Sequence, residues 1–145
     1  GIQALDLLGR KVVMNGGAGL KLLAGRIGET IQRAGQLEGL AVPANELAAA
    51  LQRLGTATKA AWATGVPEEA LANATPYLQA FGHVVLAWLW LDVGLAAQRS
   101  GGDLAPGKLA ALRYFYAYEL PKIDAWLAVV ARREALPREM QDAWF

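Results

Sequence analysis

Apolar residues recur at spacings of three and four along most of this 145-residue chain, which is the period of an α-helix. The alternation of apolar and polar residues that marks a half-buried β-strand does not occur, and neither does the usual enrichment in β-branched residues. The pattern therefore predicts an all-α fold. We expect an up-down helical bundle of four long antiparallel helices, preceded by one shorter N-terminal helix.

Glycine and proline residues set the predicted limits of the helices. Asn15–Gly17 should end or bend the first helix, and Ser100–Asp103 should form a turn before the last one. Thr75 is the expected cap of the helix at 76–99, with Pro76 in its first turn, and Pro121 should kink the last helix near Ala117. The predicted shorter helix covers residues 5–14, and the four long ones cover 18–36, 44–64, 76–99 and 106–134, with a connection at 37–43, a short helical turn at 67–73 and a tail at 138–145. The stripe predicted for the first helix is Leu5, Leu8 and Val12.

Composition narrows the possible functions. Hydrophobic residues make up 54% of the chain and charged residues only 19%, which implies a large buried interface within the bundle or against another surface. The net charge is +1, from 14 basic and 13 acidic residues without a run of like charge. Because binding to a phosphate backbone requires clustered positive charge, we expect no nucleic-acid partner.

The chain contains no cysteine, which excludes disulfides, thiolate nucleophiles and thiolate metal sites. This composition is compatible with the reducing cytoplasm, where we expect the protein to be located. The sequence begins at Gly1 with no basic leader, so we expect no signal peptide and interpret the chain as a piece of a longer protein. The apolar run Val84–Leu91 is shorter than the roughly 20 residues that a membrane span needs. We expect a buried core helix there.

Few residues are candidates for chemistry. His83 is the only histidine, and its neighbours at helical spacing include no metal ligand, so we expect a packed or surface side chain with local hydrogen bonds, and no metal site. Asp92 lies inside the most apolar helix, where an unpaired carboxylate would be costly. An ion pair with Arg113 is the favoured interpretation, and an acid with a perturbed pKa in a pocket is the alternative.

Two further patterns have structural interpretations. Arg113 adjoins the aromatic residues Tyr114, Phe115, Tyr116 and Tyr118, which we expect to pack in the core with their hydroxyls at its rim. The segment Gly16–Gly19 lacks the sequence context of a phosphate-binding loop, so it predicts a helix break. The residues alone therefore predict a helical bundle without an active site of its own.

Two stretches resemble a known family. Residues 1–11, Gly-Ile-Gln-Ala-Leu-Asp-Leu-Leu-Gly-Arg-Lys, resemble the segment that follows the catalytic Tyr-Glu-Gly-Thr motif in extended bacterial acyl-CoA dehydrogenases. A second set of segments resembles the extra C-terminal domain of those enzymes: Asn73–Leu78, Phe81-Gly82, Trp88-Leu89, Arg113–Tyr116 and Leu120-Pro121. In that family the motif's glutamate removes the α-proton of an acyl-CoA while a hydride passes to FAD. The resemblance implies that residues 1–15 are the end of the catalytic-domain helix and a linker, and that residues 16–145 are an accessory C-terminal helical bundle.

The resemblance also implies where the chemistry lies. The catalytic base would precede this chain, so no catalytic residue is expected here, and Gly1 is the one candidate for contact with FAD, at the edge of the family's FAD segment. The parent enzyme would bind FAD, oxidise an acyl-CoA to a 2-enoyl-CoA and pass electrons to an accepting protein; this piece alone should bind no FAD and be inactive. We expect the bundle to brace the remainder of the dehydrogenase and the subunit interface of a homo-oligomer, without membrane binding because a cationic amphipathic face is missing.

Two alternatives remain open. One is a self-sufficient helical protein-interaction module with no enzyme attached. The other is ligand binding within the bundle core, which predicts a cavity among Tyr77, Phe81, Trp88 and Tyr116.

Overall fold

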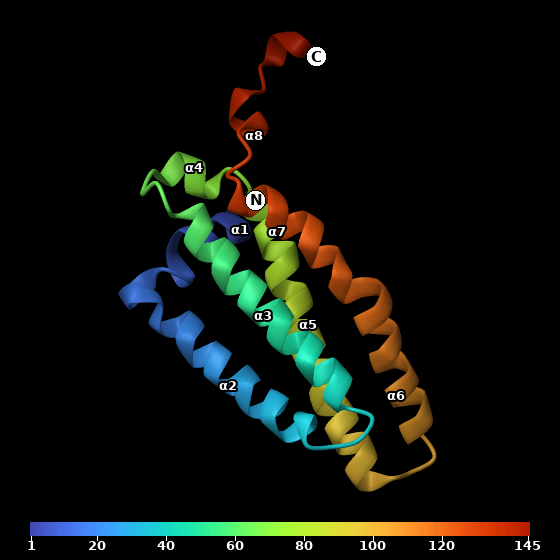
Figure 1. The fold of residues 1–145 in the computed structure, drawn as a ribbon. Coiled ribbons are helices and arrows are strands. Elements are labelled where there is room, and N and C mark those ends of the chain that lie inside the picture. Colours follow the sequence, from blue (N-terminus) through green and yellow to red (C-terminus); the bar gives the residue numbers. More distant parts are fainter.

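The computed structural model describes all 145 residues and consists of helices, turns and bends without a strand. The predicted all-α class is confirmed. Long helical rods lie side by side, and the chain reverses direction at each connection between them (Figure 1). These rods are α2 (Ala18–Gly35), α3 (Ala41–Ala61), α5 (Ala74–Ser100) and a last rod that contains α6 (Ala105–Tyr114) and α7 (Ile123–Ala131).

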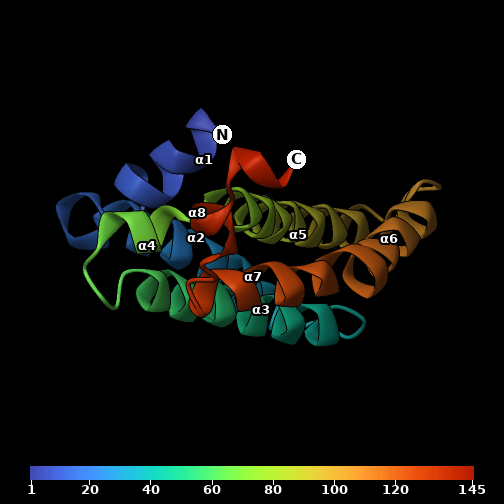
Figure 2. The ribbon, with the colours of Figure 1, turned by 90° about the horizontal axis from the view of Figure 1, so that it is seen from above.

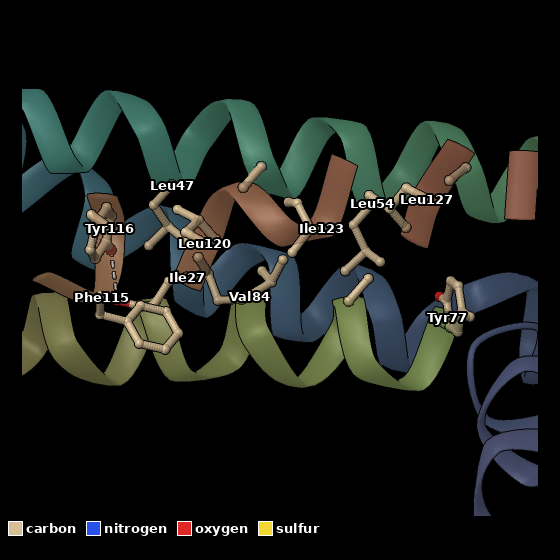
Figure 3. Close-up of a cluster of buried hydrophobic side chains, with 14 of the residues drawn as sticks. Ile27, Leu47, Leu54, Tyr77, Val84, Phe115, Tyr116, Leu120, Ile123 and Leu127 are labelled. Carbon is tan, nitrogen blue, oxygen red and sulfur yellow. Dashed lines mark hydrogen bonds between the residues drawn. The ribbon is translucent and has the colours of Figure 1, made fainter. Parts of the chain in front are cut away.

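The rods enclose one hydrophobic core of 25 buried residues. α3 packs between α2 and α7, and α5 packs against α2, α3, α6 and α7. Figure 3 shows how leucine, valine and isoleucine side chains from α3, α5 and the last rod meet in this core, among them Leu54, Val84 and Ile123. Burial of such apolar surface is the main stabilising contribution in a fold of this kind.

The central helix α5 contributes mostly small residues to the interior. Its buried positions include Ala80, Ala87 and Gly94, which repeat every seven residues and so lie on one side of the helix. A Cβ atom built at Gly94 would lie 2.7 Å from a methyl carbon of Leu112. Small residues therefore let the last rod approach α5 closely, and many of the large apolar residues of α5 point elsewhere.

The N-terminal segment differs from its prediction. α1 covers Ile2–Asp6 and continues as a π-helical turn, Leu7–Lys11, before a 3-10 turn at Met14–Gly17. Leu8 and Val12 are buried as predicted, but Ala4 takes the place of Leu5, which is 47% exposed. The break falls where it was predicted, because Asn15–Gly17 all adopt left-handed backbone angles.

Two prolines lie inside the first turns of helices. α3 begins at Ala41 rather than Ala44, and Pro43 occupies its first turn, where a missing N–H costs no helical hydrogen bond. α5 begins at Ala74 after Asn73, so Thr75 is not its cap and Pro76 again lies in the first turn. Gly101 ends α5 with a left-handed φ of 61°.

The last rod is interrupted near the position that Pro121 predicted. A π-helical turn, Phe115–Glu119, and a 3-10 turn, Leu120–Lys122, separate α6 from α7. Proline has no N–H to donate, and these turns change the hydrogen-bond pattern of the residues that precede it. The interruption thus accommodates Pro121 without ending the rod.

Three short pieces complete the chain: α4 (Pro67–Leu71), α8 (Leu136–Glu139) and a 3-10 turn at Asp142–Trp144. Figure 2 shows α1 and the C-terminal tail projecting from the side of the bundle on which α5 lies. Ala4 and Leu8 belong to the same hydrophobic core as the four rods. The proposed boundary between residues 15 and 16 remains a prediction.

Candidate functional site

His83 lies at the contact between α5 and the π-helical turn of the last rod. Its Nε2 is 3.2 Å from Oε2 of Glu119, and its ring meets Trp126 edge-on with centroids 4.8 Å apart. A hydrogen bond from Lys122 and one from His83 lower the pKa of Glu119 below its usual value. His83 is thus a packed residue, as predicted, although its partner comes from another helix rather than from its own.

Asp92 does not pair with Arg113, so that prediction is wrong. Oδ1 of Asp92 accepts a hydrogen bond from the hydroxyl of Thr30 at 3.1 Å and lies 3.8 Å from the guanidinium of Arg33. Its side chain is 42% exposed, which removes the need for a buried countercharge. Asp92 faces α2 rather than α6, and the indole N–H of Trp88 completes this α2–α5 contact by donating to Thr30 at 2.8 Å.

The aromatic cluster of the last rod divides between core and surface. Phe115 and Tyr116 are buried, whereas Tyr114 and Tyr118 are exposed and stack on each other with centroids 4.7 Å apart. The Tyr116 hydroxyl lies within the core and donates to the carbonyl of Ala87 at 2.7 Å, so the predicted rim position is wrong for this residue. Burial raises the pKa of Tyr116, which keeps its hydroxyl neutral.

The two titratable residues singled out in the sequence lie in separate contacts, His83 with Glu119 and Asp92 with Thr30. No three side chains among its histidine, aspartate and glutamate residues lie close enough to hold a metal ion. Gly1 is exposed, its carbonyl already accepts the Leu5 amide at 3.0 Å, and a Cβ placed on it would meet nothing within 4 Å. Having no side chain, Gly1 can offer FAD only its backbone. A contact between Gly1 and FAD in the parent enzyme remains a prediction.

A groove between α2 and α3 lies away from the predicted cavity. We call it the α2/α3 groove; it has a volume of about 450 Å³. It is lined by residues of α2, of α3 and of the segment that precedes α2: Val12, Val13, Gly16, Gly17, Leu20, Lys21, Ala24, Leu51, Leu54, Gly55, Thr58, Lys59 and Trp62. The residues of the predicted cavity are engaged otherwise: Tyr77 with Thr58, Trp88 with Thr30 and Tyr116 with Ala87.

A second feature is an apolar surface on α5. We call it the α5 outer face: Leu78, Val85, Leu86, Leu89 and Val93. Their spacing places them on one side of the helix, opposite the small buried residues. Leu86 and Leu89 are 44% and 48% exposed. α5 is also the one helix long and apolar enough to cross a membrane, with a mean hydropathy of 1.6 over a window that is 33% buried.

Neither feature was predicted from the sequence, for identifiable reasons. The α5 outer face was not recognised because α5 is apolar nearly all round. However, alanine and glycine lie on one side of this helix and the large apolar residues on the other, and this separation could have identified the exposed face. The groove depends on small residues in two different helices, Ala24 and Gly55, whose alignment a sequence does not reveal. Only the unusual Gly55 in the middle of α3 pointed to it.

Comparison with known proteins identifies the family of this chain. The family model described as "Acetyl-CoA dehydrogenase C-terminal like" matches residues 23–141. A 3-methylmercaptopropionyl-CoA dehydrogenase of Ruegeria pomeroyi is 34% identical over 116 residues, which cover 73% of this chain and 18% of that protein. No solved structure matches. The chain spans less than a fifth of the length of this relative, and it belongs to the family of acyl-CoA dehydrogenase C-terminal domains.

Proposed function

We propose that this chain is the accessory C-terminal domain of an FAD-dependent enzyme that oxidises an acyl-CoA to a 2-enoyl-CoA. The family match over residues 23–141 is the observation that supports this proposal. FAD would supply hydride-accepting chemistry when bound in the parent, and we expect no site for it among the residues of this chain alone. The reaction, the acyl-CoA and the electron-accepting protein therefore belong to the remainder of the enzyme.

The role proposed for the bundle is to brace the catalytic body through the α5 outer face. Leu86 and Leu89 are half exposed in a helix whose other side is closely packed. Large exposed apolar patches on a folded domain usually mark an interaction surface. α1 and the C-terminal tail project from the same side, and they add exposed Ile2, Trp144 and Phe145.

A protein surface is a better partner for this face than a lipid surface. From Thr75 to Gln98 the sequence of α5 contains no lysine or arginine, whereas helices that bind membrane surfaces combine apolar and basic faces. The proposed parent is a cytoplasmic homo-oligomer, and the same side of the bundle would contribute to its subunit contacts. The absence of cysteine is compatible with that compartment.

Cysteine labelling tests the docking face directly, because the chain has no cysteine of its own. A Leu89→Cys variant is prepared both in this chain and in the intact parent, and labelling by a water-soluble maleimide is followed by peptide mass spectrometry. We expect rapid labelling in the isolated chain and strong protection in the parent. Leu22→Cys is the matched control, since Leu22 is 65% exposed on α2 and should be labelled rapidly in both proteins.

Equal labelling of Leu89→Cys in the two proteins would contradict docking through this face. The enzymatic part of the proposal has its own test: the parent should bleach its flavin on addition of acyl-CoA, and this chain should bind no flavin. A Tyr-Glu-Gly-Thr-type motif encoded immediately upstream also supports the parent enzyme. A start codon at that position would instead support the stand-alone interaction module.

A further inference from the structure

Three different parts of the chain line the α2/α3 groove. The beginning of α2, the second half of α3 and the segment Val12–Gly17 converge at one end of the bundle (Figure 1). Leu20, Leu51 and Trp62 supply much of its apolar lining. The volume of about 450 Å³ lies within the range of roughly 300–1,000 Å³ that is typical of small-molecule sites.

Small residues on both helices create the space. Ala24 of α2 and Gly55 of α3 both line the groove, and a Cβ built at Gly55 would meet no atom within 4 Å. The polar side chain of Thr58 is already satisfied, because its hydroxyl is 2.8 Å from both the carbonyl of Leu54 and the hydroxyl of Tyr77. An apolar occupant would thus leave no hydrogen-bonding group of this wall unpaired.

Positive charge lies where the groove meets solvent. Lys21 and Lys59 both line the groove and are exposed, and neither forms an ion pair with a carboxylate. None of the 13 lining residues is acidic. The N-terminus of α2 adds partial positive charge at the same end, since Gly17 caps it without a side-chain hydrogen bond.

From these observations we propose that the α2/α3 groove binds a long-chain fatty carboxylate. The alkyl chain lies against Leu20, Leu51 and Trp62, and the carboxylate is held by the ammonium groups of Lys21 and Lys59. The apolar wall has no unpaired polar group and therefore favours the alkyl chain of the ligand. The two lysines have no competing acid and therefore favour its carboxylate head group. This site is separate from the α5 outer face, and its binding does not depend on the docking proposed above.

Trp62 provides a local reporter for binding. Titration of this chain with a palmitate brominated along its chain should quench tryptophan fluorescence, because a heavy atom placed in the groove lies next to the Trp62 indole. The Trp62→Phe variant should lose most of that quenching while calorimetry still detects binding. Quenching that persists in Trp62→Phe would place the ligand beside another tryptophan and overturn the proposal.

Substitutions at two glycines, one in the groove and one outside it, test whether palmitate occupies the α2/α3 groove. Gly55→Leu should fill the groove and raise the Kd for palmitate about tenfold or more, because overfilling a packed site carries a penalty of that order. Gly82→Leu introduces the same side chain into α5, also where a Cβ meets no atom within 4 Å and outside the groove, and should leave the Kd unchanged. Both variants should retain the helical circular dichroism of the wild type. Equal Kd values for Gly55→Leu and wild type would overturn the proposal.

The head group is tested with the Lys21→Gln/Lys59→Gln double variant. Its Kd for palmitate should rise roughly three- to tenfold, as expected for two partly exposed ion pairs, while its Kd for methyl palmitate should match that of the wild type. An unchanged Kd for palmitate would contradict the assignment of the carboxylate.

The intact parent should bind brominated palmitate as well. Binding by the isolated chain alone would show that another part of the enzyme covers the groove, and would overturn the proposal. Leu89→Cys labelling reports on docking independently of either result.

Discussion

The hydroxyl of Tyr116 donates a hydrogen bond to the backbone carbonyl of Ala87 at 2.7 Å, and this bond ties the π-helical turn of the last rod to the middle of α5. Tyr116 is only 5% exposed and lies in the core near Leu47 and Leu120 (Figure 3). Because Pro121 interrupts the α-helix a turn later, this part of the rod relies on contacts with its neighbours.

Replacement of Tyr116 by phenylalanine should therefore lower the free energy of unfolding by about 1 kcal/mol, the usual net value of an intramolecular hydrogen bond. The ring and its packing are retained, so the helical content should not change. Urea denaturation followed by circular dichroism gives the measurement. Tyr114→Phe is the control, because Tyr114 is 60% exposed and should lose almost nothing. Equal stabilities for the two variants would show that the buried bond contributes little.

Gly94 permits the close approach of α5 and α6, so alanine should be harmful there. A Cβ at this position would lie 2.7 Å from a methyl carbon of Leu112 and 3.1 Å from one of Leu40, and both leucines are fully buried. We expect Gly94→Ala to destabilise the protein by about 1 kcal/mol or more, even though alanine is the better helix former. Thermal unfolding monitored at 222 nm measures the change.

The matched substitution is Gly82→Ala, on the same helix but in open space. This variant should gain about 0.5–1 kcal/mol, because only the helix propensity changes. A stabilising effect at both glycines would mean that α6 moves away from α5 at little cost. A destabilising effect at both glycines would mean that helix propensity does not determine the change in stability at either position.

Helix limits were predictable because their causes are local. Asn15–Gly17 and Gly101 adopt left-handed conformations, and Pro121 disrupts the rod that contains it; each effect depends on a few neighbouring residues. The first turns of α3 and α5 were misplaced because proline is compatible with a helix start at several positions.

Contacts between helices were harder to predict, since they depend on how the rods rotate about their axes. The sequence favoured Arg113 as the partner of Asp92, yet α5 presents Asp92 to Thr30 on α2. The groove beside Gly55 follows from the same kind of alignment, as an empty volume left where two small residues face it. Such features belong to the packed tertiary structure rather than to any single segment.

The α2–α5 contact yields a prediction about Thr30, which is 2% exposed and accepts the indole N–H of Trp88. A Thr30→Val variant keeps the shape but leaves this donor without its partner, so the free energy of unfolding should fall by about 1–3 kcal/mol. Trp88 fluorescence should also shift as its hydrogen bond is lost. Asp92→Asn tests the other end of the contact and should have a small effect, because the Asp92 side chain is 42% exposed. A larger loss in Asp92→Asn than in Thr30→Val would contradict this assignment.

Tyr77 should make the fold sensitive to alkali. Burial raises its pKa from 10.0 to about 12, against a smaller opposing effect of the hydrogen bond with Thr58. A group whose pKa is raised by folding contributes its full stabilisation below pH 10, the unfolded value, and loses it as the pH rises through 12. A shift of this size corresponds to about 2–3 kcal/mol, and burial of Tyr116 acts in the same direction. The free energy of unfolding, measured in urea between pH 9 and 12, should therefore fall less steeply for Tyr77→Phe than for the wild type. Tyr118→Phe, at a position that is 64% exposed, should follow the wild-type curve; parallel curves for all three proteins would show that Tyr77 ionises as readily in the folded state as in the unfolded chain.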